Sequence, residues 1–306
     1  MPESIQDAVE RHAAAVGFSA LKRASETLSR GYRESGSTAL AGLPPAERVA
    51  AYLATRMPAT YAAAVAALRD TRDLAIASLL DIGAGTGAAS VAVSHWFPEL
   101  DRITLIERDT ALADAAREFL PTAQIRNENF ARIPAFPPHD LVLAAYSLSE
   151  TPDPSLILRL WEAARVLVVI EPGTPRGFAV VREIRTRLLA AGAHMLAPCP
   201  GAGPCPIDES DWCHFAARVE RSALHRRLKE ADLNYEDEKF SYVAFAREPV
   251  APAPSRIIRR PQHQPGLIAL ETCTPGGIET VRVSRRDRDR FRAARRAAWG
   301  DRFPSL

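Results

Sequence analysis

The sequence predicts an α/β fold built around a parallel sheet, and two patterns indicate it. The first is a series of short apolar runs that alternate with helical stretches: "IASLLDIG", "RITLIE", "DLVLAAY" and "VLVVIEP". The second is a glycine-rich turn between the first run and a helix of small residues. Strands that alternate with helices are typical of a parallel sheet covered on both faces. We therefore expect a doubly wound α/β domain.

Composition excludes several other classes of protein. The 306 residues are 47% hydrophobic and 25% charged, which is typical of a soluble globular chain with a full core. The N-terminal segment carries Glu3, Asp7 and Glu10 without a basic stretch and an apolar run, so neither a signal peptide nor a transit peptide fits. No apolar segment reaches membrane-spanning length. We expect a cytoplasmic protein with no membrane partner. In such a compartment, clustered cysteines are more often metal ligands or redox groups than structural disulfides.

The chain divides into three parts by composition. Residues 1–72 are rich in Ala, Leu, Arg and Glu at helical spacing, so we expect a helical N-terminal region. Residues 73–248 contain the α/β pattern and a cysteine-rich insertion at 194–225. A Pro- and Ala-rich linker opens residues 249–306, which contain short strand-like segments and a basic tail. Nine arginines and three aspartates lie between Arg282 and Arg302, although the net charge of the chain is only +2.

The stretch "LLDIGAGTGAASVAV" carries the first candidate site. A buried strand is predicted to end at Asp81, Gly83, Gly85 and Gly87 follow at alternate positions, and a helix begins at Ala88. Glycines permit a tight turn and close approach of a ligand, and a helix N-terminus supplies unpaired amides. The spacing differs from G-x-G-x-x-G, so a dinucleotide site is not the best match. Alternatively, the glycines form only a turn that joins the strand to the helix and bind no ligand.

This stretch resembles motif I of the class I S-adenosylmethionine (SAM) methyltransferases, in which the loop cradles the methionine part of the cofactor. The resemblance implies a Rossmann-like methyltransferase fold. It also implies that Glu107, at the tip of the next strand, accepts hydrogen bonds from the ribose hydroxyls. Asn129 in "NENFARIP" lies where such enzymes usually carry an Asp that contacts the adenine. The expected SAM-binding residues are Asp81, Gly83, Gly85, Gly87, Glu107 and Asn129.

SAM binding does not by itself establish methyl transfer, and the sequence leaves the catalytic residues unknown. The segment "AAYSLSE" lacks the Asn/Asp-Pro-Pro-Tyr/Phe signature of enzymes that methylate exocyclic amines of bases. No cysteine lies near the ends of the fourth and fifth strands, where enzymes that methylate C5 of cytosine carry one. The side chains that remain are weak catalytic candidates: Tyr146, Ser147, Glu150 and Glu171. We expect a SAM-dependent methyltransferase whose acceptor the sequence does not name.

Three of the four cysteines fall in "CPGAGPCPIDESDWCHF", and the fourth lies in "LIALETCTPGG". The chain has four cysteines in all, which is enough for one metal site with four thiolate ligands. Pro- and Gly-rich loops can direct such side chains toward a common point. The gaps of six and eight residues match neither a zinc knuckle nor a ferredoxin run. Buried free thiols are the alternative, because unpaired cysteine behaves as a small hydrophobe. We expect His214 to form a hydrogen bond within the loop rather than to bind metal.

Several blocks resemble the methyltransferase-like family of the mitochondrial ribosomal small subunit, which has bacterial relatives: "CPGAGPCP", "DWCHF", "YEDEKFSYVAFAR" and "SRRDRDRFRAARRAAWGD". The resemblance runs from about Arg48 to the C-terminus and points to a bacterial cytoplasmic member. It implies a protein that acts on the small ribosomal subunit and its rRNA or assembles it. It also implies a four-iron, four-sulfur ([4Fe-4S]) cluster, with zinc as the alternative, bound by Cys199, Cys205, Cys213 and Cys273.

Three functional hypotheses follow. The leading one is a SAM-binding methyltransferase-like protein with an iron-sulfur cluster that acts on small-subunit rRNA, or in assembly of the subunit or translation. The second is a non-catalytic assembly factor that keeps its SAM site. The third is a small-molecule methyltransferase with a zinc site. The sequence leaves the acceptor atom and the oligomeric state open.

Overall fold

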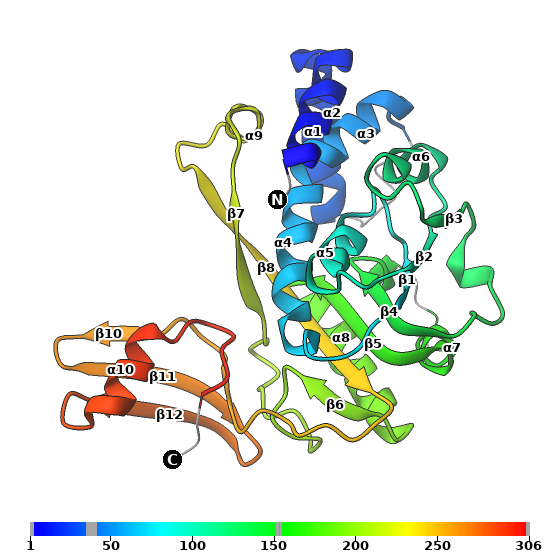
Figure 1. The fold of residues 1–306 in the computed structure, drawn as a ribbon. Coiled ribbons are helices and arrows are strands. Elements are labelled where there is room, and N and C mark those ends of the chain that lie inside the picture. Colours follow the sequence, from blue (N-terminus) through cyan, green and yellow to red (C-terminus); the bar gives the residue numbers. More distant parts are fainter. Residues whose placement is uncertain (1–2, 35–41, 151–152, 154, 304–306) are drawn as a thin grey trace. The chain divides into compact units, whose positions relative to one another are not determined.

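The computed structural model describes residues 3–34, 42–150, 153 and 155–303. The chain forms two compact units, in which unit 1 combines Met1–Ala164 with Ala217–Glu238 (Figure 1). Unit 2 combines Arg165–Ala216 with Lys239–Leu306. Across the described ranges, no helix has both the length and the apolar character that a membrane span needs. The division by composition at residues 72 and 248 stays a prediction.

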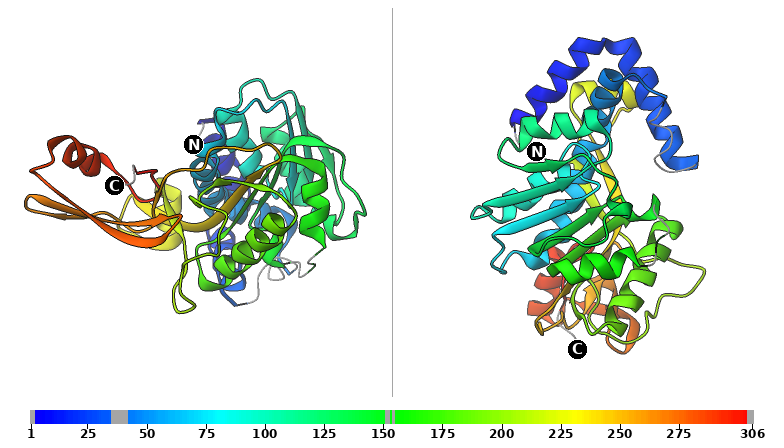
Figure 2. Two further views of the ribbon diagram at one scale, coloured as in Figure 1. Left: turned by 90° about the horizontal axis from the view of Figure 1, so that it is seen from below. Right: turned by 90° about the vertical axis from the view of Figure 1, so that its right-hand side faces the viewer.

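Unit 1 begins with helices, as the sequence predicts. They are α1 (Glu3–Val16), α2 (Phe18–Glu34), α3 (Pro45–Thr55), α4 (Met57–Leu68) and the 3₁₀ turn η2 (Arg69–Thr71). Pro45 opens α3, where a missing N–H costs nothing because the first amides of a helix have no partner within it. Helices α1 and α2 pack on α3 (Figure 2). Their apolar faces share one core with Ala88, Leu112 and Leu228 from later elements of the unit.

A parallel sheet forms the centre of unit 1, with strands in the order β3-β2-β1-β4. The strands are β1 (Ser78–Ile82), β2 (Arg102–Ile106), β3 (Gln124–Arg126) and β4 (His139–Ala145). The helices between and after them are α5 (Ala88–Trp96), α6 (Thr110–Phe119), η3 (Phe130–Arg132), η4 (Leu148–Glu150) and α7 (Leu156–Ala163). All five residues of β1 are buried, as expected of a strand with neighbours on both sides. The predicted α/β, Rossmann-like fold is confirmed.

The remaining part of unit 1 is a strand-helix-strand segment. It consists of β7 (Phe215–Glu220), α9 (Ala223–Lys229) and the start of β8 (Tyr235–Ala246), which pairs with β7. Ser222 caps α9, because its hydroxyl accepts a hydrogen bond from the His225 amide. The block "YEDEKFSYVAFAR", which carries part of the family resemblance, contains β8, and this strand continues into unit 2.

Unit 2 contains two groups of antiparallel strands, of which only the second is a separate sheet. The first has the order β5-β8-β6, from β5 (Ala164–Pro172) and β6 (His194–Ala197), with α8 (Pro175–Ala190) between them in the chain. The second contains β9 (Arg256–Ile257), β10 (Gln262–Gln264), β11 (Leu267–Thr274) and β12 (Gly277–Ser284). Helix α10 (Arg288–Arg296) packs on β11 and β12 over a core that includes Ile257, Leu270 and Phe303. The strand-like segments and the basic tail therefore form one small body.

The shared core of unit 1 predicts that its N-terminal helices unfold together with its sheet. Leu53 in α3 is fully buried, and Leu53→Ala should lower the free energy of unfolding by about 2 to 5 kcal/mol. Leu158→Ala in α7 is the matched control, because that leucine is 39% exposed and should change stability by only about 0.5 kcal/mol. Chemical denaturation followed by circular dichroism measures both. If the helical circular dichroism signal of Leu53→Ala were lost in a separate transition at lower denaturant concentration, the N-terminal helices would not share a core with the sheet.

Candidate functional site

The glycine loop joins β1 to α5 and begins the candidate cofactor site. Gly83, Gly85 and Gly87 have φ values of 70°, 56° and 79°, in the left-handed region that other residues rarely adopt. A Cβ atom on Gly83 would lie 2.6 Å from Cβ of Ser147, so this approach also requires glycine. Helix α5 begins at Ala88, as predicted, and β1 ends at Ile82, one residue later than predicted.

Glu107 follows β2 directly and holds the glycine loop. Its Oε2 accepts a hydrogen bond from the Gly85 amide at 2.8 Å, and its Oε1 accepts one from the Asp109 amide at 2.8 Å. The residue is only 8% exposed. Burial raises the pKa of Glu107, and the two amide hydrogen bonds oppose that rise. One carboxylate thus joins the loops that follow two neighbouring strands, while each oxygen keeps further acceptor capacity.

Asp81 lies beneath the loop rather than at its surface. It is 1% exposed, and its Oδ2 accepts a hydrogen bond of 2.6 Å from the Ser90 hydroxyl in α5. Burial raises the pKa of Asp81 to about 7, against the opposing effect of the Ser90 hydrogen bond. The predicted ligand-binding residue therefore connects β1 to α5. A direct contact between Asp81 and SAM stays a prediction.

Asn129 comes after β3 and has a local partner. Its side-chain oxygen accepts a hydrogen bond of 3.0 Å from the Ala131 amide and so caps the turn η3. The residue is half-buried. The structure joins Asp81, the glycines and Glu107 through adjacent segments and hydrogen bonds, whereas the described hydrogen bond of Asn129 stays within its own turn. Its contact with adenine stays a prediction.

Helix α3 and the residue after it contribute three side chains that sequence reasoning missed. Arg48 pairs with Asp109, with Nε 2.9 Å from Oδ2. The Tyr52 hydroxyl oxygen lies 3.1 Å from the point where a Cβ of Gly85 would stand. Arg56 lies over the ring of Tyr146, 5.5 Å from its centroid. The spacing of four residues was the available signal, because such positions share one face of a helix.

The weak catalytic candidates lie in different places. Tyr146, at the end of β4, has a φ of 58°, and its hydroxyl donates to Oε1 of Glu238 at 3.1 Å. Ser147 donates to the Ile82 carbonyl at 2.8 Å and so packs β4 against the glycine loop. Glu171 is fully buried in β5 of unit 2, and the side chain of Glu150 lies outside the described residues. A strained backbone at a strand end is a frequent feature of functional sites.

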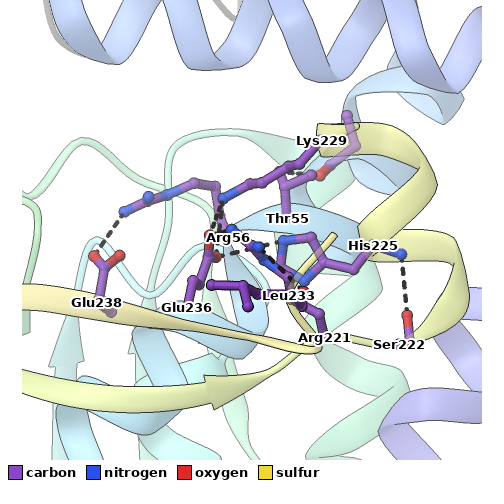
Figure 3. A network of polar contacts seen from close by, with 10 residues as sticks. Thr55, Arg56, Arg221, Ser222, His225, Lys229, Leu233, Glu236 and Glu238 are labelled. Carbon is purple, nitrogen blue, oxygen red and sulfur yellow. Dashed lines mark hydrogen bonds and ion pairs between the residues drawn. The ribbon is translucent and has the colours of Figure 1, made fainter. Parts of the chain in front are cut away.

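A network of charged side chains fixes the start of β8, where Glu238 lies (Figure 3). Glu236 accepts from Arg221 and Lys229, each at 2.8 Å, and lies 3.4 Å from Nε2 of His225. Burial lowers the pKa of His225 to about 4, so the ring is neutral near pH 7. The network therefore supplies Glu236 with two permanent cations and holds the strand that carries Glu238.

All four cysteines line one cavity of about 140 Å³ in unit 2. Three come from the irregular segment 198–214, and the fourth comes from β11. Phe178, Ile207 and Ile258 form a small apolar core against this cavity. The four cysteines, which come from two separate segments of the sequence, therefore lie around one cavity, as expected from the sequence. The cavity is similar in volume to one of roughly 150 Å³ that can hold a benzene molecule.

The thiols share a buried electrostatic environment. All four are free cysteines. Burial raises the pKa of Cys199, of Cys213 and, to about 12, of Cys273, and charge repulsion from neighbouring cysteines raises all three further. Within the described ranges, no three Cys, His, Asp or Glu side chains stand as a ready metal-binding group. The structure thus supplies four donors around one cavity, and their role as metal ligands stays a prediction.

His214 lies beside the cavity and has the role expected of it within the loop. Its Nδ1 lies 3.2 Å from the Trp212 carbonyl oxygen. Its ring stacks on Trp212 at a centroid distance of 5.3 Å and meets the edge of Trp299 at 4.9 Å. Trp212 in turn donates its indole N–H to the Gly173 carbonyl at 2.9 Å. The ring packing fixes the segment that carries Cys213.

The buried carboxyl of Asp81 predicts a pH dependence of stability. Its folded-state pKa of about 7 exceeds an unfolded value of about 3.9, so the folded chain binds more protons between them. The free energy of unfolding should therefore fall as pH rises from about 4 to about 7, and Glu107 adds to the fall. Urea titrations should show a smaller fall for Asp81→Asn, whereas the exposed control Asp114→Asn should match the wild type. Equal slopes for all three proteins would contradict this account.

A family model described as mitochondrial small ribosomal subunit Rsm22 matches residues 46–304 of this chain. Two curated relatives from Schizosaccharomyces pombe, the mitochondrial Rsm22-cox11 tandem proteins 1 and 2, are each 24% identical to it over 324 residues. The matched region covers 84% of this chain, and the chain spans only 43% of the length of these relatives.

Solved structures of methyltransferases also show a distant likeness. The plantazolicin methyltransferase BpumL in complex with SAH is 13% identical, with 80% of this chain and 99% of that chain covered and a TM-score of 0.46. A precorrin-6y C5,15-methyltransferase from Geobacter metallireducens is 18% identical, with coverage of 61% and 87% and a TM-score of 0.40. The fold assignment rests on the strand order of unit 1, and the family match covers most of the sequence. This chain belongs to the Rsm22 family of the mitochondrial small ribosomal subunit.

Proposed function

We propose that this protein binds SAM at the glycine loop and methylates RNA of the small ribosomal subunit. The observation that carries the proposal is the loop itself: three glycines in the left-handed region, held by the buried Glu107 carboxylate. The family supports the ribosomal part of the proposal, because its description refers to the small ribosomal subunit. The rRNA substrate and the activity belong to the proposal alone.

The residues around the loop fit SAM. The glycines place no side chain between the backbone amides and a ligand. Glu107 has used one acceptor position on each oxygen and could accept ribose hydroxyls with the others. The Thr86 hydroxyl in the same loop is buried and has no hydrogen-bond partner among the described residues. A buried polar atom without a partner is costly, which favours a ligand that supplies one.

The chain's own residues would position the acceptor. SAM, when bound, supplies a methyl group on a positively charged sulfur. Tyr146 lies at the end of β4 next to the loop, and its ring and hydroxyl are held by Arg56 and Glu238. Tyr146 is only 9% exposed and has Arg56 over its ring, so it would act as a fixed wall beside the loop rather than stack on a base. A fixed wall helps to hold an acceptor in line with the methyl group. We therefore assign Tyr146 a positioning role toward the acceptor.

The cysteine cavity supports a second part of the proposal, a [4Fe-4S] cluster bound by Cys199, Cys205, Cys213 and Cys273. Four thiolates satisfy such a cluster without an open position. A cluster held in this way would be structural. It would connect the segment 198–214, which has no helix or strand of its own, to Cys273 in the strand β11. A zinc site with the same four ligands is the alternative.

Exposed arginines support RNA as the partner. Of the nine arginines between Arg282 and Arg302, all except Arg290 are exposed, and several lie on α10. One guanidinium group can bind two oxygens of a phosphate at once, and it can stack on an unpaired base. The body made by β9–β12 and α10 therefore offers a basic surface without a large opposing charge. A non-catalytic assembly factor would use the same surface, and mapping of rRNA methylation separates the two roles.

The cofactor proposal predicts micromolar SAM affinity, which corresponds to about −8 kcal/mol. Gly85→Asp should abolish binding, because the new side chain fills the loop and places an anion beside the ligand's carboxylate. Gly17→Asp is the matched control: Gly17 has a similar φ of 78° and no atom near its Cβ position, so this variant should bind like the wild type. Calorimetry measures all three. A folded wild-type protein that gives no heat with SAM would end the proposal.

The RNA proposal predicts a salt dependence. Deletion of the tail would disturb the small sheet, because Phe303 is buried in its core. The better variant replaces Arg288, Arg292, Arg295 and Arg296 by Gln on α10, with the same four changed to Lys as the control. If all four neutralise phosphates of single-stranded RNA, the slope of log K against log salt should flatten by about 3 in the Gln variant only. Fluorescence titrations with a small-subunit rRNA fragment measure the slopes, and an unchanged slope would show that α10 does not contact RNA.

A further inference from the structure

Arg185 is a buried cation at the cysteine cavity. It lies on α8, lines the cavity and is only 7% exposed. Its Nη2 donates to the carbonyl oxygens of Gly201 at 2.9 Å and Gly203 at 2.6 Å. Its Nε–H is buried and has no hydrogen-bond partner in the described part of the chain. Two of its contacts are therefore neutral carbonyls, and one donor has no acceptor.

A second buried arginine holds the other side of the same segment. Arg256, at the start of β9, is 1% exposed. Its Nε donates to the Pro198 carbonyl and its Nη1 to the Gly300 carbonyl, each at 2.9 Å. The two guanidinium groups thus hold the chain at Pro198, directly before Cys199, and at Gly201 and Gly203 after it. Burial raises the pKa of Cys199, and the positive charges of Arg185 and Arg256 oppose that rise.

Arg259 provides a contrast within the same region. It acts by charge on Cys213, but it pairs with Asp211 and lies 3.8 Å from Glu271. Its charge is therefore balanced by carboxylates at a partly exposed position. Among the described residues, Arg185 forms no ion pair with any carboxylate, and its two described acceptors are neutral carbonyls.

Burial of an uncompensated charge costs several kcal/mol, and neutral thiols cannot offset it. Four thiolates that bind a dication retain two negative charges, and a cubane cluster with four thiolates is likewise anionic. A cavity that holds such a centre would contain the anion that Arg185 lacks. The same centre would supply an acceptor sulfur for the unpartnered Nε–H.

We propose that Arg185 is the buried counter-charge of an anionic four-thiolate centre in this cavity. Arg185 is a positioning residue: its charge balances the charge of the centre, whereas its carbonyl contacts only fix the guanidinium group beside Cys199. The inference rests on the proposed metal centre, and it holds for an iron-sulfur cluster or for zinc, because both leave an anionic centre.

The test uses the full-length chain reconstituted under nitrogen with ferrous iron and sulfide, and in a second arm with zinc. Metal per chain and the rate of metal release to a chelator are measured for wild type, Arg185→Gln, Arg185→Lys and Arg187→Gln. Arg187 is the matched control, because it lies on the same helix and pairs with Glu183 at a partly exposed position. Arg185→Gln should release metal at least about tenfold faster, as groups outside the ligand shell commonly change affinity by 10- to 100-fold. Arg185→Lys and Arg187→Gln should stay within about twofold of the wild type.

Release from Arg185→Gln at the wild-type rate would overturn the inference. Release from Arg185→Lys at ten times the wild-type rate would also overturn it, because lysine keeps the charge and loses only the forked carbonyl contacts. That comparison decides the question even if Arg185→Gln does not fold. A folded wild-type protein that takes up neither iron nor zinc would instead refute the metal centre itself, before any variant is compared.

Discussion

The arrangement of unit 1 depends on one buried carboxylate. Glu107 accepts hydrogen bonds from the Gly85 and Asp109 amides, so the loops that follow β1 and β2 are joined through a single side chain. Asp109 extends the connection, because it pairs with Arg48 of α3. The glycine loop, the second strand and the N-terminal helices are therefore held by one continuous chain of charged and polar contacts. Ser147 closes the opposite side of the loop through the Ile82 carbonyl.

Each unit buries charge of one sign at its candidate site. Unit 1 buries the carboxyl groups of Asp81 and Glu107 around the glycine loop, and unit 2 buries the guanidinium groups of Arg185 and Arg256 around the cysteines. Buried charge is retained only where hydrogen bonds or an opposite charge compensate for lost water. The amides and the Ser90 hydroxyl compensate in unit 1, and its acidic character suits a cationic sulfonium ligand. In unit 2, carbonyls accept hydrogen bonds from Arg185, and the anionic centre that we propose would balance its charge.

Sequence reasoning predicted the elements that local pattern determines. Buried strands such as β1 are continuous apolar runs, and glycines at positions 83, 85 and 87 are needed for a left-handed turn, so both features are visible in the chain. The common place of the four cysteines followed from their number and from the resemblance. The contacts of Arg48 with Asp109 and of Arg185 with Gly203 were not predictable, because they depend on packing between separate segments. The hydrogen bond from Ser90 to Asp81 was missed because spacing does not show which way a carboxyl faces.

The central claim is that the glycine loop serves methyl transfer to small-subunit rRNA. The most direct test is mass-spectrometric mapping of modified nucleosides in that rRNA from cells that lack the protein, complemented with wild type or with Gly85→Asp. Our account predicts that one methylated nucleoside is missing in the deletion, returns with the wild-type protein and stays missing with Gly85→Asp. If the deletion strain kept the complete set of methylated nucleosides, the claim would be contradicted. The result would favour the alternative of a non-catalytic assembly factor.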